Sequence, residues 1–276
     1  SSTGYPAPYG NYYKGARHQF LILASELPSF CVDSIKSLAF DVFSTTGPLT
    51  DFTIKIGHTN QTTMVDWEQN VTEVYTASSY QTVSGFNEHV FQNPFLYNGC
   101  DNIVVEVCFN NTGFTSNALT RYTTTSFQSV IYYRADAAGV CTNQGQSGVS
   151  SNRPNMVLGL SGVTSTFDAA ICALTSPVTE CQFTNEQVSA VISNLGSTTI
   201  STLPVAFTVN GGSAINETYT GSIAPGEKDT FDFSTLANMN AGSSFDIQVY
   251  HASSSDFCTQ NDTALLSLST TLNGAY

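Results

Sequence analysis

The sequence predicts an all-β protein built as two β-sandwiches in tandem. Three observations lead to this fold class. Apolar residues recur with a period of two, as in half-buried strands. Turns rich in glycine, proline and asparagine separate these runs. No amphipathic stretch longer than about two turns has helix caps at both ends. Many short strands without helical crossovers are typical of sandwiches and barrels.

The alternating runs predict individual antiparallel strands with one face on a core. Apolar residues alternate with polar or small ones at residues 52–56, 103–109, 188–192, 205–209 and 245–249. Turn signals lie between them at Asn98-Gly99, at residues 210–212 and at Pro225-Gly226.

The composition changes between residues 161 and 167, where a Gly/Ser/Thr stretch joins an aromatic-rich part to one dominated by Ser, Thr, Val and Ala. We therefore predict a first domain at residues 1–165, long enough for a jelly-roll-like sandwich of about eight strands. Residues 168–276 fit an immunoglobulin-like sandwich of roughly seven strands. The joining stretch is short, so we expect the domains to touch.

Composition excludes several partners. The chain has 276 residues and is 41% hydrophobic, which is enough to fill real cores. Its formal net charge is -13, and its 8 Lys and Arg residues are scattered singly, so we expect no nucleic acid or anionic lipid as partner. No apolar run approaches the ~18 residues of a membrane span, which predicts no direct membrane insertion. Because no signal peptide precedes Ser1, we expect a processed protein or an excised fragment.

The seven cysteines predict disulfides formed in an oxidising compartment. None lies in a C-x-x-C pair or beside a His at zinc spacing, and a catalytic thiol would need a His that the sequence does not locate. Cys108 points away from its apolar strand neighbours, and Cys181 and Cys258 come early and late in the second domain. The predicted pairs are Cys181–Cys258, Cys108–Cys141 and Cys31–Cys100, which leaves Cys172 over.

An ordered set of short motifs runs through residues 168–276. It comprises DAA (168–170), EQV (186–188), NLG (194–196), LPV (203–205), VNGG (209–212), APG (224–226) and NDT (261–263). The set resembles the cell-adhesion-related, immunoglobulin-like modules common in large secreted proteins of Bacteroidota. That resemblance implies an extracellular or cell-surface location.

The first domain resembles a module that often precedes those repeats in surface adhesins and in hydrolases exported by the type IX system. The matching stretches include YY (12–13), RHQ (17–19), ASEL (24–27), IKSLAF (35–40), FTIK (52–55), PF (94–95) and RPN (153–155), with residues 102–110. The resemblance carries no catalytic residues. That family's sorting signal lies at the far C-terminus and nothing like it ends this chain, so we expect a piece of a longer protein. The triplets at Ser34 and Thr263 resemble the O-glycosylation motif of the phylum.

No catalytic constellation is recognisable. The four His are far apart, and no G-x-S-x-G, H-E-x-x-H or phosphate-binding loop occurs. Paired carboxylates for glycoside hydrolysis need only converge in space. We interpret the candidates as solvated or ion-paired, and we expect Glu26 to pair with Arg17 or Arg153. These candidates are Glu26, Asp41, Glu68 and Glu106.

Aromatic side chains are the candidate ligand contacts, because exposed rings can stack on sugars. We select Tyr12, Tyr13 and Trp67, with Trp67 in an exposed loop. The alternative is that the tyrosine rings cap the core of the first domain. Calcium is the plausible ion, since oxygen ligands abound, although plain turn chemistry explains the same residues. Its candidate ligands are Asp51, Asp101 and Asn102.

Two functions remain open. The first is a non-catalytic adhesin or surface-filament segment that contacts other extracellular protein chains or glycans. The second is an accessory carbohydrate-binding region of a secreted hydrolase, with the first domain as the binder. A catalytic domain upstream would favour the second, and many further repeats would favour the first.

Overall fold

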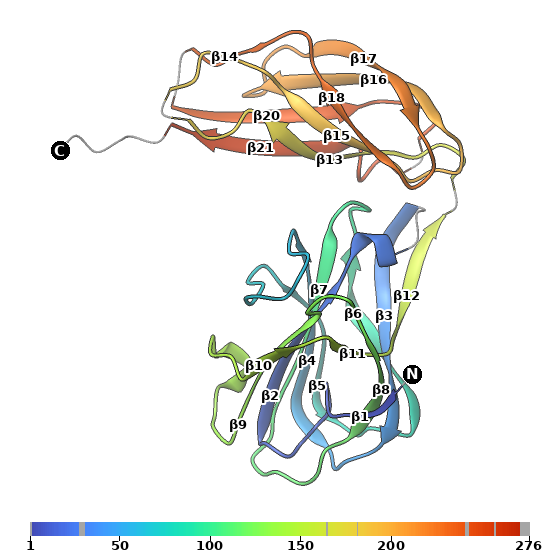
Figure 1. The fold of residues 1–276 in the computed structure, drawn as a ribbon, viewed down its shortest axis with the longest axis vertical. Helices are drawn as coiled ribbons and strands as arrows, with labels where there is room; N and C mark the ends of the chain where they lie inside the picture. The colour runs from blue at the N-terminus through green and yellow to red at the C-terminus, as the bar shows by residue number, and fades with distance from the viewer. Residues whose placement is uncertain are drawn as a thin grey trace, which may run out of the picture. The chain divides into compact units, whose positions relative to one another are not determined.

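The structure is a computed structural model, which describes residues 2–27, 31–163, 165–180, 182–240, 243–256 and 258–270. These residues form two compact units, both built from strands (Figure 1). The first contains residues 2–27, 34–97 and 101–161, and the second contains residues 31–33 and 98–100 together with the chain from 162 onward. The predicted all-β, sandwich-type fold class is confirmed.

Two sheets and two short 3-10 helices make up the first unit (Figure 1). One sheet has the order β10-β9-β2-β7-β4-β5, and the other has the order β1-β8-β3-β12, with β11 paired to β8 and β6 paired to β3. The elements are β1 (Ser2–Tyr5), β2 (Gly15–Ile22), η1 (Ala24–Glu26), β3 (Cys31–Ser44), β4 (Leu49–Thr59), β5 (Thr72–Tyr80), β6 (Gly85–Leu96), β7 (Asn102–Asn110), β8 (Leu119–Thr124), β9 (Val130–Ala135), η2 (Val140–Thr142), β10 (Gly148–Ser150), β11 (Asn152–Pro154) and β12 (Met156–Val163).

The centre of the first unit is aromatic. Phe52 lies on the apolar face predicted for β4 and is fully buried. Its ring stacks on His89 with 5.0 Å between the ring centres, and the Tyr9 ring packs against both Phe40 and Phe52. The Tyr9 hydroxyl is 2.6 Å from His89 Nε2, so the polar tips of these two buried rings satisfy each other.

The sheet that contains β2 and β7 is covered on both faces. Met64 and Trp67, from the loop after β4, pack on Leu21 and Val104 on the face turned away from the central core. Every residue of β2 is therefore buried, whereas a strand with one wet face would alternate. The expected single buried face of residues 103–109 was wrong for this reason, because those residues are buried on both faces.

The second unit has an immunoglobulin-like arrangement. Its three-stranded sheet is β13-β15-β18, and its four-stranded sheet is β17-β16-β20-β21, with β14 and β19 forming a separate pair. Phe207, Phe233 and Phe245 belong to the core between them. The strands are β13 (Ala169–Ser176), β14 (Asn185–Glu186), β15 (Ser189–Asn194), β16 (Ile200–Val209), β17 (Ile215–Ile223), β18 (Lys228–Asp232), β19 (Ala237–Asn238), β20 (Ser244–His251) and β21 (Thr263–Ser269). None of the helices among the described residues is long and apolar enough to cross a membrane.

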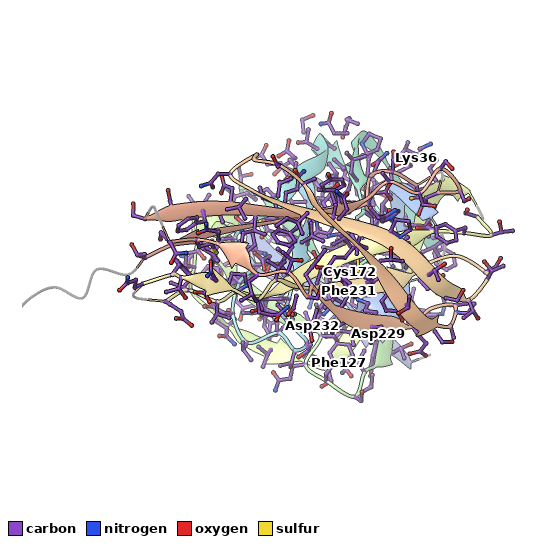
Figure 2. The ribbon with its side chains drawn as sticks, turned by 90° about the horizontal axis from the view of Figure 1, so that it is seen from above. Lys36, Phe127, Cys172, Asp229, Phe231 and Asp232 are labelled. Carbon is purple, nitrogen blue, oxygen red and sulfur yellow. A yellow bond between two sulfur atoms is a disulfide. The ribbon has the colours of Figure 1, made fainter. Side chains whose placement is uncertain are left out.

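The disulfides confirm one predicted pair and correct another. Cys108 is bonded to Cys141 as predicted, with 5.6 Å between the Cα atoms. Cys100, however, is bonded to Cys172 across 5.3 Å, so both the Cys31–Cys100 pair and an unpaired Cys172 were wrong (Figure 2 labels Cys172).

The reason is that residues 98–100 belong to the second unit although their neighbours in sequence belong to the first. Cys100 packs with Ala170 and Leu195, and Lys228 Nζ donates to its carbonyl oxygen at 3.1 Å. Cys258 is also disulfide-bonded. The predicted Cys181–Cys258 pair involves Cys181, which lies outside the described residues.

Candidate ligand-binding pocket

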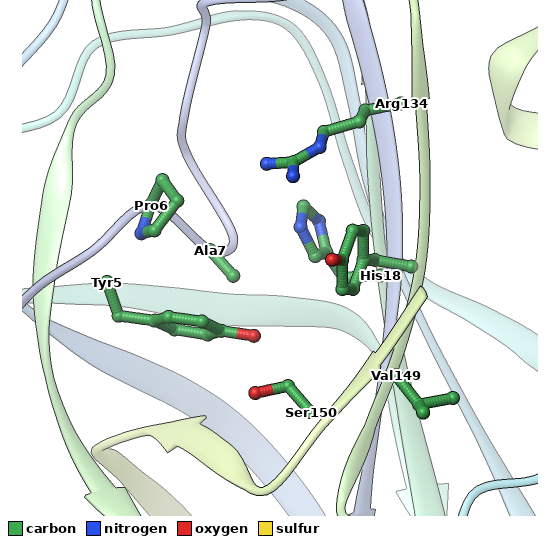
Figure 3. A pocket seen from close by; sticks show the side chains of 8 residues that line it. Tyr5, Pro6, Ala7, His18, Arg134, Val149 and Ser150 are labelled. Atoms are coloured by element: carbon green, nitrogen blue, oxygen red, sulfur yellow. The ribbon is translucent and has the colours of Figure 1, made fainter. Parts of the chain in front are cut away.

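A pocket of about 230 Å³ opens in the first unit between strands of its two sheets (Figure 3). β1 and the residues after it form one wall, and β2, β9 and β10 form the other. The lining residues are Tyr5, Pro6, Ala7, His18, Tyr132, Arg134, Val149 and Ser150.

Strand register explains why the polar side chains converge. His18 of β2 lies opposite Tyr132 of β9, and residue 16 lies opposite Arg134. Alternate residues of a strand share a face, as do cross-strand partners, so His18, Tyr132 and Arg134 point to the same side of the sheet. Ser150 of β10 lies opposite residue 130, which is again on that face.

The opposite wall is held by hydrogen bonds to Thr120 of β8. The Thr120 hydroxyl is within hydrogen-bonding distance of the carbonyl oxygens of Tyr5 and Ala7, at 3.1 and 2.8 Å. These contacts fix the backbone on both sides of Pro6, and the Tyr5 ring reaches across toward Ser150 (Figure 3). Burial raises the pKa of Tyr5, and a hydrogen bond with Ser150 partly offsets this.

His18 forms the floor between pocket and core. Its ring stacks on Phe20 at 5.9 Å and lies 6.0 Å from the ring centre of Tyr132. Burial, assisted by the positive charge of Arg134, lowers the pKa of His18 to about 3. The imidazole is therefore neutral at physiological pH and can donate or accept a hydrogen bond.

Arg134 supplies the charge of the pocket. Its guanidinium carbon is 4.9 Å from the ring centre of Tyr132 and 5.5 Å from that of Tyr13. Among the described residues, no carboxylate forms an ion pair with Arg134. Arg17, Arg121 and Arg153 each have such a partner. The pocket thus combines an uncompensated cation, two tyrosine rings and several hydrogen-bonding groups.

The predicted ligand residues divide into three cases. Tyr13 is half-buried and lies beside the pocket through its contact with Arg134. Tyr12 is 61% exposed and packs edge-on against Tyr13, but it does not line the pocket. The exposed position expected for Trp67 was wrong, because the loop that carries it folds over β2 and leaves Trp67 only 4% exposed. Its indole Nε1 donates to the Gly145 carbonyl at 3.1 Å.

The predicted calcium ligands do not come together. Asp51 is exposed near the start of β4 with a positive φ of 53°, and Asn102 lies opposite Thr59 at the other end of that strand. Strand rise places these ends about 26 Å apart. The Asn102 side-chain oxygen accepts from the Ala24 amide at 2.7 Å, and Asp101 has a partner of its own.

The two candidate glycosylation positions differ in access. Ser34 is 6% exposed on β3, where a bulky glycan has no room on the folded chain. Thr263 is exposed at the start of β21.

The candidate carboxylates are all engaged. Glu26 pairs with Arg153 at 2.5 Å, and Arg153 is one of the two partners that were predicted for it. This pairing lowers the pKa of Glu26. Asp41 pairs with Arg121 at 2.7 Å, and Glu106 pairs with Arg17 at 2.7 Å. Glu68 Oε1 accepts from a backbone amide at 3.1 Å.

Sequence reasoning missed His18 and Arg134 as site residues. In the sequence, the only indication of these residues is that Tyr132 and Arg134 alternate within a short apolar run. This alternation does not reveal which strand pairs with theirs, so it cannot place His18 beside them. The second unit also brings His251, Asp256 and Asp262 together, with one potential ligand atom from each within 4.8 Å of the other two.

No family model and no curated protein matches the sequence. Among solved structures, the chain is similar to a GH2 beta-galacturonidase from Eisenbergiella tayi bound to galacturonate. The sequence identity is 13% and the TM-score is 0.30, and the match covers 96% of this chain and 38% of that protein. It is also similar to Bacteroides uniformis beta-glucuronidase 2, with 12% identity, 95% and 28% coverage, and a TM-score of 0.30. The chain thus spans well under half of these proteins, and scores this low carry no functional conclusion.

Proposed function

We propose that this chain is a non-catalytic segment of an extracellular adhesin-like protein and that the pocket of its first unit binds an acidic sugar residue of a glycan. The observation that carries this proposal is Arg134, whose guanidinium faces the pocket without a carboxylate partner among the described residues. A guanidinium binds a carboxylate or sulfate through paired, charge-assisted hydrogen bonds. In a chain of net charge -13, an unpaired cation at a pocket favours an anionic ligand.

The remaining lining residues suit a sugar. The rings of Tyr5 and Tyr132 offer apolar surface with a polar tip, and Ser150 and His18 add hydrogen-bonding groups. The volume of about 230 Å³ is below the ~300–1,000 Å³ of most drug-sized sites, which favours a single sugar residue. The same binding would serve an adhesin or an accessory region of a secreted hydrolase.

The engagement of the candidate carboxylates supports a non-catalytic role. A glycosidase needs two carboxylates free to act on the substrate. Glu26, Asp41 and Glu106 are instead paired with arginines, and no carboxylate is among the lining residues described above. The disulfides, Cys100–Cys172 and Cys108–Cys141 among them, indicate folding in an oxidising compartment, which supports the extracellular setting.

The test is calorimetric titration of the full chain with glucuronate, galacturonate and N-acetylneuraminate, beside the neutral sugars glucose and galactose. A hexuronate has about 13 non-hydrogen atoms, and ~0.3 kcal/mol for each gives about -4 kcal/mol, a Kd near 1 mM. We expect binding of at least one acidic sugar and none of the neutral ones. Losing one charge-assisted pair costs ~1.5–3 kcal/mol, so Arg134→Gln should weaken binding roughly 10- to 100-fold.

Arg121→Gln is the matched control, because Arg121 lies on β8 in the same unit and is paired with Asp41. It should bind like the unmodified chain. The proposal is wrong if acidic and neutral sugars bind equally, if none binds at 10 mM, or if Arg134→Gln leaves the affinity unchanged.

A further inference from the structure

One end of the second unit gathers polar side chains from two separate stretches of sequence. His251 is the last residue of β20, Asp262 precedes β21, and Asp256 and Asn261 lie in the loop between those strands. Asp168 comes just before β13. All five are at most 8% exposed.

Backbone hydrogen bonds hold the connecting loop in place. The Ala169 amide donates to Asp256 Oδ2 at 2.7 Å, and the Cys258 amide donates to Asp256 Oδ1 at 2.9 Å. The amide of His251 donates to the carbonyl oxygen of Asp262 at 3.1 Å. The side chains are therefore positioned by the fold before any ligand arrives.

The spacing of three donor atoms suits a metal ion. His251 Nε2 lies 3.0 Å from Asp262 Oδ1 and 3.7 Å from Asp256 Oδ2, and the three atoms lie within 4.8 Å of one another. An ion bound at ~2.0–2.2 Å to each ligand separates its ligand atoms by roughly 3–4 Å. Both measured distances from Nε2 fall in this range.

The charge of the group is not balanced by the protein. Asp168, Asp256 and Asp262 are buried together, and among the described residues His251 is the one basic side chain in ion-pair contact with Asp256 and Asp262. Asp168 Oδ2 and Asn261 Oδ1 are buried without a hydrogen-bond partner. Buried carboxylates require a proton or a cation.

Asp168 is the least satisfied of these carboxylates. Asn261 Nδ2 donates to its Oδ1 at 3.1 Å, whereas its Oδ2 has no hydrogen-bond partner among the described residues.

We infer that His251, Asp256 and Asp262 bind a divalent transition-metal ion of the zinc class, with Asp168 and Asn261 as their supporting shell. The imidazole ligand separates this site from the all-oxygen sites that calcium and magnesium prefer. The Ser253 amide donates to His251 Nδ1 at 3.4 Å, so Nε2 carries the ring proton and donates to the Ala169 carbonyl oxygen at 2.5 Å. Metal binding at Nε2 would move this proton to Nδ1, so both contacts, with Ala169 and with Ser253, would have to open.

The test measures metal bound by the full chain after free thiols have been alkylated, since the odd count of seven cysteines leaves at least one thiol outside internal pairs. After dialysis against limiting zinc, we expect one equivalent per chain by atomic emission. Cobalt in its place should give weak visible d–d bands without a thiolate charge-transfer band, because the donors are nitrogen and oxygen.

Asp262→Asn keeps the shape of the side chain, and His251→Gln removes the imidazole. Both should lose the bound equivalent, whereas the control Asp232→Asn, on exposed β18, should retain it (Figure 2). Near-ultraviolet circular dichroism verifies that Asp262→Asn is folded, so loss of metal is not loss of structure. The inference is overturned if the unmodified chain binds no zinc, if it binds calcium in preference, or if folded Asp262→Asn still binds one equivalent.

Discussion

Replacing Glu106 by Gln should strongly destabilise the first unit. Glu106 Oε2 accepts from Arg17 Nε at 2.9 Å, from Arg17 Nη2 at 2.7 Å and from Gln19 Nε2 at 2.9 Å. The side chains of Arg17 and Glu106 are 5% and 1% exposed. The variant keeps the shape but leaves the Arg17 cation buried without its counter-ion, which costs ~3–5 kcal/mol.

The assay is urea unfolding followed by tryptophan fluorescence. Trp67 is the single tryptophan of the chain, and the Arg17 guanidinium lies 4.1 Å from its ring centre, so the signal reports this part of the first unit. A loss of about 4 kcal/mol with an m-value of ~2 kcal/mol/M lowers the urea midpoint by about 2 M.

Two variants separate burial from charge. Arg121→Gln breaks the ion pair between Arg121 and Asp41, whose side chains are 36% and 14% exposed. Because this pair is partly solvated, its loss should lower the free energy of unfolding by about 1 kcal/mol or less. Arg17→Met combined with Glu106→Leu removes both charges, so it should recover much of the stability that Glu106→Gln loses. If Glu106→Gln costs no more than Arg121→Gln, the reasoning about the buried pair is refuted.

Two further predictions concern pH and redox conditions. Burial lowers the pKa of both His18 and His89 from 6.5 to about 3, so the unfolded chain binds more protons between these values and stability falls as the pH drops below 6.5. Between pH 7 and pH 5, each histidine should lower the free energy of unfolding by ~2 kcal/mol. His89→Phe removes one of the two groups, so its urea midpoint should depend less on pH. An unchanged midpoint of the unmodified chain between pH 7 and 5 would contradict this. The Cys100–Cys172 bond spans 72 residues, and its loss in Cys172→Ser should lower the free energy of unfolding by up to about 4 kcal/mol in the chain-entropy model. The measurement is the calorimetric melting temperature of the second unit. A melting temperature that does not fall would count against the prediction.

Local patterns predicted much of the fold. Phe52, Ile54 and Ile56 are fully buried, as their alternation indicated. Cys108 lies on the face of β7 opposite its apolar neighbours and meets Cys141, a consequence of the same two-residue period. Glu26 was correctly expected to need a basic partner, because a partly buried carboxylate is unfavourable alone.

The failures share a physical cause. Trp67 lies between two acidic residues, a pattern typical of a solvent-exposed loop, yet this loop folds back over β2 and buries the Trp67 ring. Cys100 lies between two stretches of the first unit, yet its three-residue segment packs in the second. Neither outcome depends on neighbours in sequence. Each depends on which distant surface offers apolar contacts.

By itself, the sequence determined the strand-rich character of the chain, its negative net charge and the presence of disulfides, because strand period, charge and cysteine content act locally or summed over the chain. Only the tertiary structure decided which side chains meet. The pocket joins Tyr5, His18 and Arg134 from three strands, and the group at His251 joins residues more than 80 positions apart. Sheet register and loop packing create these neighbours, and spacing along the chain carries no trace of them.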